Sequence, residues 1–154
     1  ALSGNTDALG TLSTGSVANS PTPRTATVNT NAKNGWSVWA RSANAGLSSA
    51  SASATIASTT PGTGSTLSAG TAGYNTGVTS SQVGGSGTIT VTPAYAGSAN
   101  TGAGLDTSLR TLASSNGTAN TAVLTMTNNV AIASTTPAAA DYTDTITVVG
   151  AGLF

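Results

Sequence analysis

The sequence predicts an all-β fold, a β-sandwich built from about eight short strands. Short segments rich in β-branched and aromatic residues recur along the chain, with apolar residues at alternate positions. Glycine, proline and asparagine separate these segments, as turns require. The segments with this pattern are Thr25–Thr30, Trp36–Arg41, Ala52–Ala57, Tyr74–Thr79, Gly87–Thr92, Thr121–Thr127, Val130–Ser134 and Asp141–Val149. Many short strands separated by turn signals are typical of a sandwich.

Two asparagine-containing turns predict hairpins between neighbouring segments. Asn34-Gly35 is a strong two-residue hairpin signal, and it would join the first segment to the second. Asn128-Asn129 predicts a second hairpin, which would join the sixth segment to the seventh. Both turns would make sequence neighbours into neighbours in a sheet.

A leucine pattern predicts the only helix. Leu105, Leu109 and Leu112 are spaced i, i+4 and i+7, which places them on one face of a helix. We therefore expect at most one short helix, over Leu105–Ala113.

The last segment is the clearest strand of the chain. Its two faces hold Tyr142, Asp144, Ile146 and Val148 on one side and Thr143, Thr145, Thr147 and Val149 on the other. A strand this well formed needs a partner strand, because its unpaired backbone groups would otherwise template pairing with another chain. The partner belongs either to the same molecule or to a neighbouring one.

Two tryptophans lie three residues apart in the second segment. Trp36 and Trp39 therefore point to opposite faces of a strand. We expect one of them in the core and the other at the surface or between subunits. An exposed tryptophan either stacks on a sugar or is buried by a neighbouring subunit.

The composition excludes several classes of partner. The chain has 154 residues, which suggests one domain, and it carries four basic and four acidic residues with no net charge. Binding to nucleic acid or to an anionic membrane surface needs clusters of lysine and arginine, and the chain has none. No apolar run approaches the roughly 18 residues of a membrane span. The chain begins at Ala1, as a secreted chain would after signal-peptide cleavage.

The residues needed for catalysis or metal binding are missing. The chain has no His, Cys or Glu, so a serine nucleophile would lack its usual imidazole base. Asp141 and Asp144 are three apart on a predicted strand and face opposite ways, which is unsuitable for a paired acid and base. We therefore expect no enzyme activity, no cofactor and no metal site. Asn116-Gly117-Thr118 is a glycosylation sequon, so Asn116 is a candidate glycosylation site.

Both chain ends resemble one known family. The stretch Pro137-Ala138-Ala139-Ala140-Asp141-Tyr142-Thr143-Asp144-Thr145-Ile146-Thr147-Val148 is similar to the P-A-G-x-Y-x-D-T-V-T-V ending of secreted spore-coat-U-like and related pilin domains. Leu9-Gly10-Thr11-Leu12, and then Ala26-Thr27-Val28-Asn29-Thr30-Asn31, are similar to the opening strands of those domains. Gly35-Trp36-Ser37-Val38 stands where their next strand starts. The chain lacks the disulfide cysteines that many members carry.

The resemblance implies a subunit of a surface fibre. Such subunits are incomplete immunoglobulin-like sandwiches, each completed by a donor strand from the next subunit. We expect residues 1–12 to form an N-terminal arm that acts as the donor strand, and residues 13–154 to form the sandwich. The C-terminal tail, with Val149, Leu153 and Phe154, is the alternative donor. The predicted polymerisation interface is Leu2, Leu9, Leu12, Ile146, Val148 and Trp39.

Composition supports assembly independently of the resemblance. Large aliphatic residues are few, and ordering a backbone rich in Gly and Ser is costly, so a lone domain would be marginally stable. Strand exchange adds backbone hydrogen bonds and apolar burial. The sequence therefore predicts a secreted structural subunit of an extracellular filament, such as a pilus or fimbria, which is a head-to-tail homopolymer. The alternative is a monomeric cell-surface adhesin or carbohydrate-binding module that binds surface glycans through an exposed aromatic residue.

Overall fold

The chain folds entirely into β-strands, turns and loops. In this computed structural model all 154 residues are described, with 12 strands and no helix. The strands are β1 (Ala18–Asn19), β2 (Arg24–Thr30), β3 (Trp36–Ser42), β4 (Gly46–Ser49), β5 (Ala54–Ala57), β6 (Ser65–Thr66), β7 (Gly73–Gly84), β8 (Ile89–Val91), β9 (Thr101–Gly102), β10 (Arg110–Ser115), β11 (Ala119–Ala131) and β12 (Ile146–Gly152). The all-β prediction is confirmed. The count exceeds eight partly because β1, β6 and β9 are two-residue strands.

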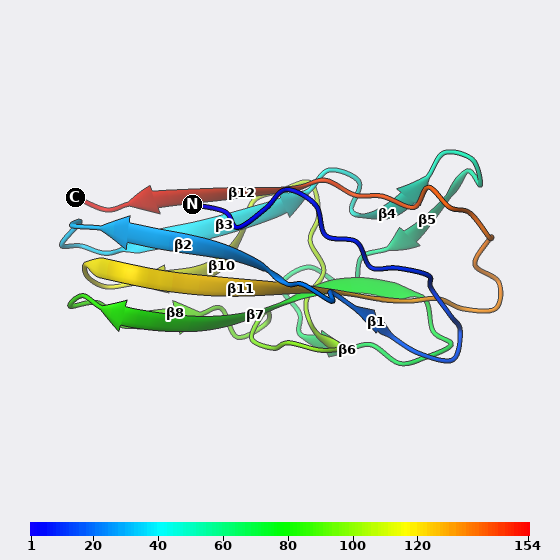
Figure 1. The fold of residues 1–154 in the computed structure, drawn as a ribbon, viewed down its shortest axis with the longest axis horizontal. Helices are drawn as coiled ribbons and strands as arrows, with labels where there is room; N and C mark the ends of the chain where they lie inside the picture. The colour runs from blue at the N-terminus through cyan, green and yellow to red at the C-terminus, as the bar shows by residue number, and fades with distance from the viewer.

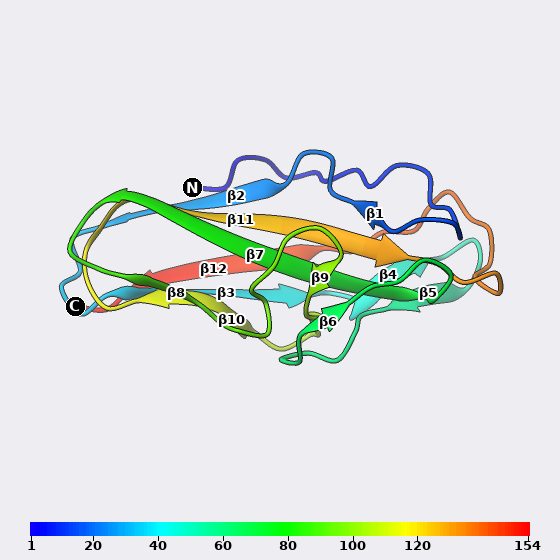
Figure 2. The ribbon, with the colours of Figure 1, turned by 90° about the horizontal axis from the view of Figure 1, so that it is seen from below.

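Two four-stranded sheets form the body of the molecule. In the first sheet, β11 pairs with β7 on one side and with β2 and then β1 on the other. The second sheet has the order β12-β3-β10-β8, and all these pairings are antiparallel. Figure 2 shows the two sheets as separate layers, and the small β4–β5 sheet lies at one end. Strands β2 and β12 are edge strands of different sheets and lie on the same side of the molecule (Figure 1).

The core is divided into two clusters. The main core lies between the two sheets and contains 14 buried residues: Ala26, Trp36, Val38, Ala40, Val78, Tyr95, Ala103, Leu105, Leu112, Ala113, Ala119, Ala122, Leu124 and Met126. The minor core contains Leu47, Ile56, Tyr74 and Val130 and lies toward the β4–β5 end. Only four residues form the minor core, so its stability depends on the segments that cover it.

The helix predicted over Leu105–Ala113 is wrong. Leu105 lies in a loop, and β10 begins at Arg110 and pairs with both β3 and β8. Leu105 and Leu112 are buried, whereas Leu109 is 50% exposed, so the three leucines do not share one apolar face. Pairing within the second sheet outweighs the short helical pattern. None of the chain's elements is a helix that could cross a membrane.

The two predicted hairpins are also wrong. The chain does turn at Asn34-Gly35, where Gly35 has a φ of 100°, but β2 and β3 belong to different sheets. A Cβ at Gly35 would overlap the carbonyl oxygen of Ser115, so this close crossing requires glycine. The Asn128-Asn129 turn does not form, because β11 runs through both residues without a break. Both asparagines are buried.

The C-terminal strand has the predicted alternation but begins later. From Tyr142 to Val149 the side chains are half-buried and exposed in strict alternation. Strand β12 itself starts at Ile146, pairs with β3 of the same chain, and continues through Gly150 to Gly152. Trp36 is buried in the main core and Trp39 is half-buried, as opposite faces of β3 predict.

Candidate functional site

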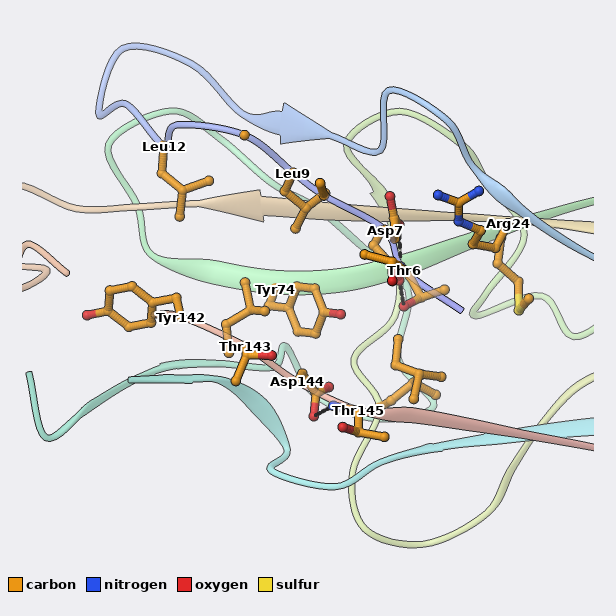
Figure 3. A pocket seen from close by; sticks show the side chains of 18 of the residues that line it. Thr6, Asp7, Leu9, Leu12, Arg24, Tyr74, Tyr142, Thr143, Asp144 and Thr145 are labelled. Atoms are coloured by element: carbon orange, nitrogen blue, oxygen red, sulfur yellow. Dashed lines mark hydrogen bonds between the residues drawn. The ribbon is translucent and has the colours of Figure 1, made fainter. Parts of the chain in front are cut away.

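A long groove opens between the edges of the two sheets. It has a volume of about 900 Å³ and runs between the N-terminal arm (Ala1–Leu12), the start of β2, and the segment from Thr136 to Val148. Figure 3 shows the arm on one side of the groove and Tyr142 to Thr145 on the other, with Tyr74 between them. Ligand-binding clefts have volumes of about 300–1,000 Å³, so the groove is large enough for a small molecule or a peptide segment.

The groove gathers five of the six predicted interface residues. Leu2, Leu9 and Leu12 from the arm line it together with Ile146 and Val148 from β12. Trp39 is not part of its lining and lies opposite Val149 in the β3–β12 pair. The other predicted site residue, Asn116, is exposed in the turn between β10 and β11, where its side-chain oxygen accepts a 2.9 Å hydrogen bond from the Thr88 amide.

The first three residues of the arm extend the edge of the first sheet. The Thr27 amide donates to the carbonyl of Ala1 at 2.7 Å, and the Ser3 amide donates to the carbonyl of Thr25 at 2.9 Å. These bonds place Leu2 directly opposite Ala26 in an antiparallel bridge. In this single chain the arm therefore forms one wall of the groove, and β2 of the same chain is its partner.

A carboxylate holds the middle of the arm. Asp7 accepts hydrogen bonds from the hydroxyl of Ser20 and from the side-chain amide of Asn128, the latter at 2.8 Å. Both donors are buried, and they belong to the segment after β1 and to β11. The second carboxylate oxygen of Asp7 is buried without a protein partner. Arg24, at the start of β2, lines the same groove, and its Nε atom is also buried without a partner.

Leucines hold the end of the arm. Leu9 and Leu12 are half-buried and pack against the minor core, as does Tyr142 from the opposite wall. The hydroxyl of Tyr142 donates to the carbonyl of Pro137 at 3.0 Å, which fixes the ring position. The arm and the segment before β12 thus cover a cluster that the sheets alone leave open.

Tyr74 forms the floor of the groove between the two walls. Burial raises the pKa of its hydroxyl, and the negative charges of Asp144 and Asp7 raise it further, so the ring stays neutral. Asp144 is fixed in the far wall because it accepts from the Ser42 hydroxyl at 2.7 Å and from the Asn44 amide at 3.2 Å. The groove therefore has an aromatic floor with a carboxylate on each side.

Asp141 ties the approach to β12 onto the small β4–β5 sheet. Its carboxylate accepts from the hydroxyls of Ser49 and Ser51, and from the Ser51 amide at 2.9 Å. These hydrogen bonds hold the pKa of Asp141 well below its usual range. Asp141 and Asp144 thus serve different turns, as their predicted opposite faces require. No group of three or more acidic residues gathers that could hold a metal ion.

Several residues of the groove were not expected from the sequence. Asp7, Arg24, Tyr74 and Asn128 line it, and they come from four separate segments of the chain. One signal was available, because Asp7 is the only charged side chain among the first 23 residues. Its partners lie 13 and 121 residues away, so no local pattern reveals them.

No protein-family model, curated protein or solved structure matches the chain. The resemblance to spore-coat-U-like and pilin domains therefore stays a prediction that rests on the motifs at the two chain ends.

Proposed function

We propose that the chain is a secreted structural subunit of an extracellular filament, and that its subunits join by exchanging N-terminal arms. In the filament, the arm of one copy takes the place of the arm on the next copy, beside β2 along the same groove. The observation that carries this proposal is that a peripheral terminal segment forms one wall of an open groove whose other wall leads into the edge strand β12. Leu2, Leu9 and Leu12 line this groove together with Ile146 and Val148, the residues predicted to receive them.

The contacts of the arm make exchange feasible without a new interface. The arm is held by a short ladder on β2, by the Asp7 hydrogen bonds and by two leucines on the minor core. An identical arm from another copy can make the same contacts, which is why exchange of a terminal element is a low-cost route to assembly. Head-to-tail exchange generates a filament when the rotation from one subunit to the next does not close a ring.

The open side of the molecule also suits an incomplete immunoglobulin-like sandwich. Strand β12 pairs only with β3, so its outer edge has no partner strand. Unpaired edges favour strand addition from another chain. The equal and small numbers of acidic and basic residues mean that identical subunits repel one another little.

A cysteine pair across the arm tests the proposal on the full chain. Leu2 and Ala26 form a non-hydrogen-bonded pair, because the backbone hydrogen bonds are made by the residues on either side of them. Such pairs have Cα atoms about 4.5 Å apart, within disulfide range. The chain has no native cysteine, so Leu2→Cys with Ala26→Cys gives no background cross-links.

Exchange predicts a covalent ladder. Concentrated protein should form filaments in negative stain, and oxidation should then give a series of multimers on a non-reducing gel. Leu2→Cys alone is the matched control and should give no product larger than a dimer. If the double variant yields only internally linked monomers and no filaments form, the arm closes on its own chain. The alternative of a monomeric adhesin would then be tested against surface glycans.

A further inference from the structure

The hydrogen bonds at Asp7 form a site whose donors are oriented before the arm arrives. The backbones of Ser20 and Asn128 pair with each other, because the Ser20 amide donates to the Asn128 carbonyl at 2.8 Å. The Asn128 amide donates to the Ser20 hydroxyl oxygen at 2.9 Å. That oxygen is thereby used as an acceptor, and its proton is directed to Asp7 or, at the longer distance of 3.3 Å, to the Asn128 carbonyl.

The side chain of Asn128 is oriented by a residue outside the arm. The Thr76 hydroxyl donates to the side-chain oxygen of Asn128 at 2.8 Å. This bond turns the amide nitrogen of Asn128 toward Asp7, to which it donates at 2.8 Å. Thr76, Ser20 and Asn128 are all buried, so water does not readily replace the carboxylate. Two oriented donors thus converge on one point along the groove.

We propose that Asp7 sets the register in which an arm docks, with Ser20 and Asn128 of the receiving copy as its receptor. This inference rests on the proposed function and adds the residue that determines where an incoming arm stops. The apolar contacts discriminate registers weakly, because the arm presents leucines at three places and the groove is apolar along much of its length. A carboxylate in front of two fixed donors discriminates strongly, because hydrogen bonds to charged groups are roughly twice as strong as neutral ones.

A slip of the arm would separate these groups. Moving an antiparallel strand by two residues keeps every side chain on the same face, so this is the shift that the sheet tolerates best. It displaces the arm by about 7 Å. Asp7 would then leave Ser20 and Asn128, and the carboxylate and both donors would lose their partners in a buried place, which is unfavourable.

Two cysteine reporters distinguish the registers in the full chain. Leu2→Cys with Ala26→Cys cross-links the native register. Leu2→Cys with Val28→Cys cross-links an arm displaced by two residues, since Val28 lies on the same face of β2. With Asp7 present we expect the Ala26 reporter to react and the Val28 reporter to remain largely free.

Asp7→Asn should change the ratio of the two products. The asparagine side-chain oxygen can still accept from Ser20 and Asn128, but both bonds lose their charge, and the new amide nitrogen takes the place of the carboxylate oxygen that is buried without a partner. We therefore expect the ratio of native to displaced cross-links to fall about tenfold. Asn5→Ala is the matched control, because Asn5 is exposed and its side chain is bonded only to the neighbouring Thr6. The control should leave the ratio unchanged.

A reciprocal exchange of the two side chains separates register from stability. Adding Asn128→Asp to Asp7→Asn restores a carboxylate facing an amide, with the carboxylate now at position 128. One of its oxygens can still accept from the Thr76 hydroxyl. We expect this double variant to recover the native ratio. An unchanged ratio in Asp7→Asn overturns the inference. A second contrary result is that Asp7→Asn loses native cross-links, the Val28 reporter gains none, and the double variant does not recover.

Failure of the proposed function gives a different result. If arms do not exchange, no covalent ladder forms in any variant, but the same reporters still close within one chain. The ratio of the two internal disulfides then reports whether Asp7 sets the register of the arm in its own groove.

Discussion

Leu12 offers a quantitative test of how the arm is held. Its side chain is half-buried against the minor core, which has only four buried members. Leu→Ala at a fully buried site costs about 2–5 kcal/mol, and the half-buried position of Leu12 at the mouth of the groove reduces this to about 1–2 kcal/mol. We expect Leu12→Ala to weaken the docking of the arm by that amount of free energy.

Hydrogen exchange at one amide reports the docking directly. The Thr27 amide is bonded to the Ala1 carbonyl, so it exchanges when the arm leaves β2. A loss of 1–2 kcal/mol should speed its exchange roughly 5- to 30-fold, since about 1.4 kcal/mol corresponds to a factor of ten. Filaments should also form faster while their final amount changes little, because the same contact is lost in the closed monomer and in the filament.

A leucine elsewhere on the surface supplies the control. Leu109 is 50% exposed and touches neither core, so Leu109→Ala should change stability by less than about 0.5 kcal/mol and leave the Thr27 amide protected. If Leu12→Ala also leaves exchange at Thr27 unchanged, the arm is not held by the minor core, and the reasoning about the groove is wrong.

Three further predictions concern the scaffold that shapes the groove. Because the folded-state pKa of Asp141 is lowered, its stabilisation is present above about pH 4 and is lost as the pH falls below that value; Asp141→Asn should therefore flatten the acid side of a Tm–pH profile. A Cβ at Gly104 would overlap the carbonyl oxygen of Thr59, so Gly104→Ala should cost about 3 kcal/mol or more in urea unfolding, whereas Gly15→Ala, whose Cβ would meet only the Ser13 hydroxyl oxygen at an ordinary 3.7 Å, should be nearly neutral. Leu112→Ala in the main core should cost about 2–5 kcal/mol in the same assay.

The candidate groove was predictable in part. The sequence marks the arm leucines and the alternate residues of the last strand, because isolated apolar residues in a polar segment and a two-residue period are local patterns. It does not mark the receptor of Asp7. Ser20 and Asn128 are ordinary polar residues until the fold buries them beside each other.

Local patterns alone therefore determined the all-β class, the opposite faces of Trp36 and Trp39, and the alternation leading into β12. Only the tertiary structure decided that β2 and β3 enter different sheets, and that β11 continues through Asn128 and Asn129. The physical reason is that buried backbone and amide groups need hydrogen-bond partners. Here those partners are distant, as when Asn129 donates to the side-chain oxygen of Asn75 at 2.9 Å, 54 residues away. A turn signal is outweighed when such partners complete a strand.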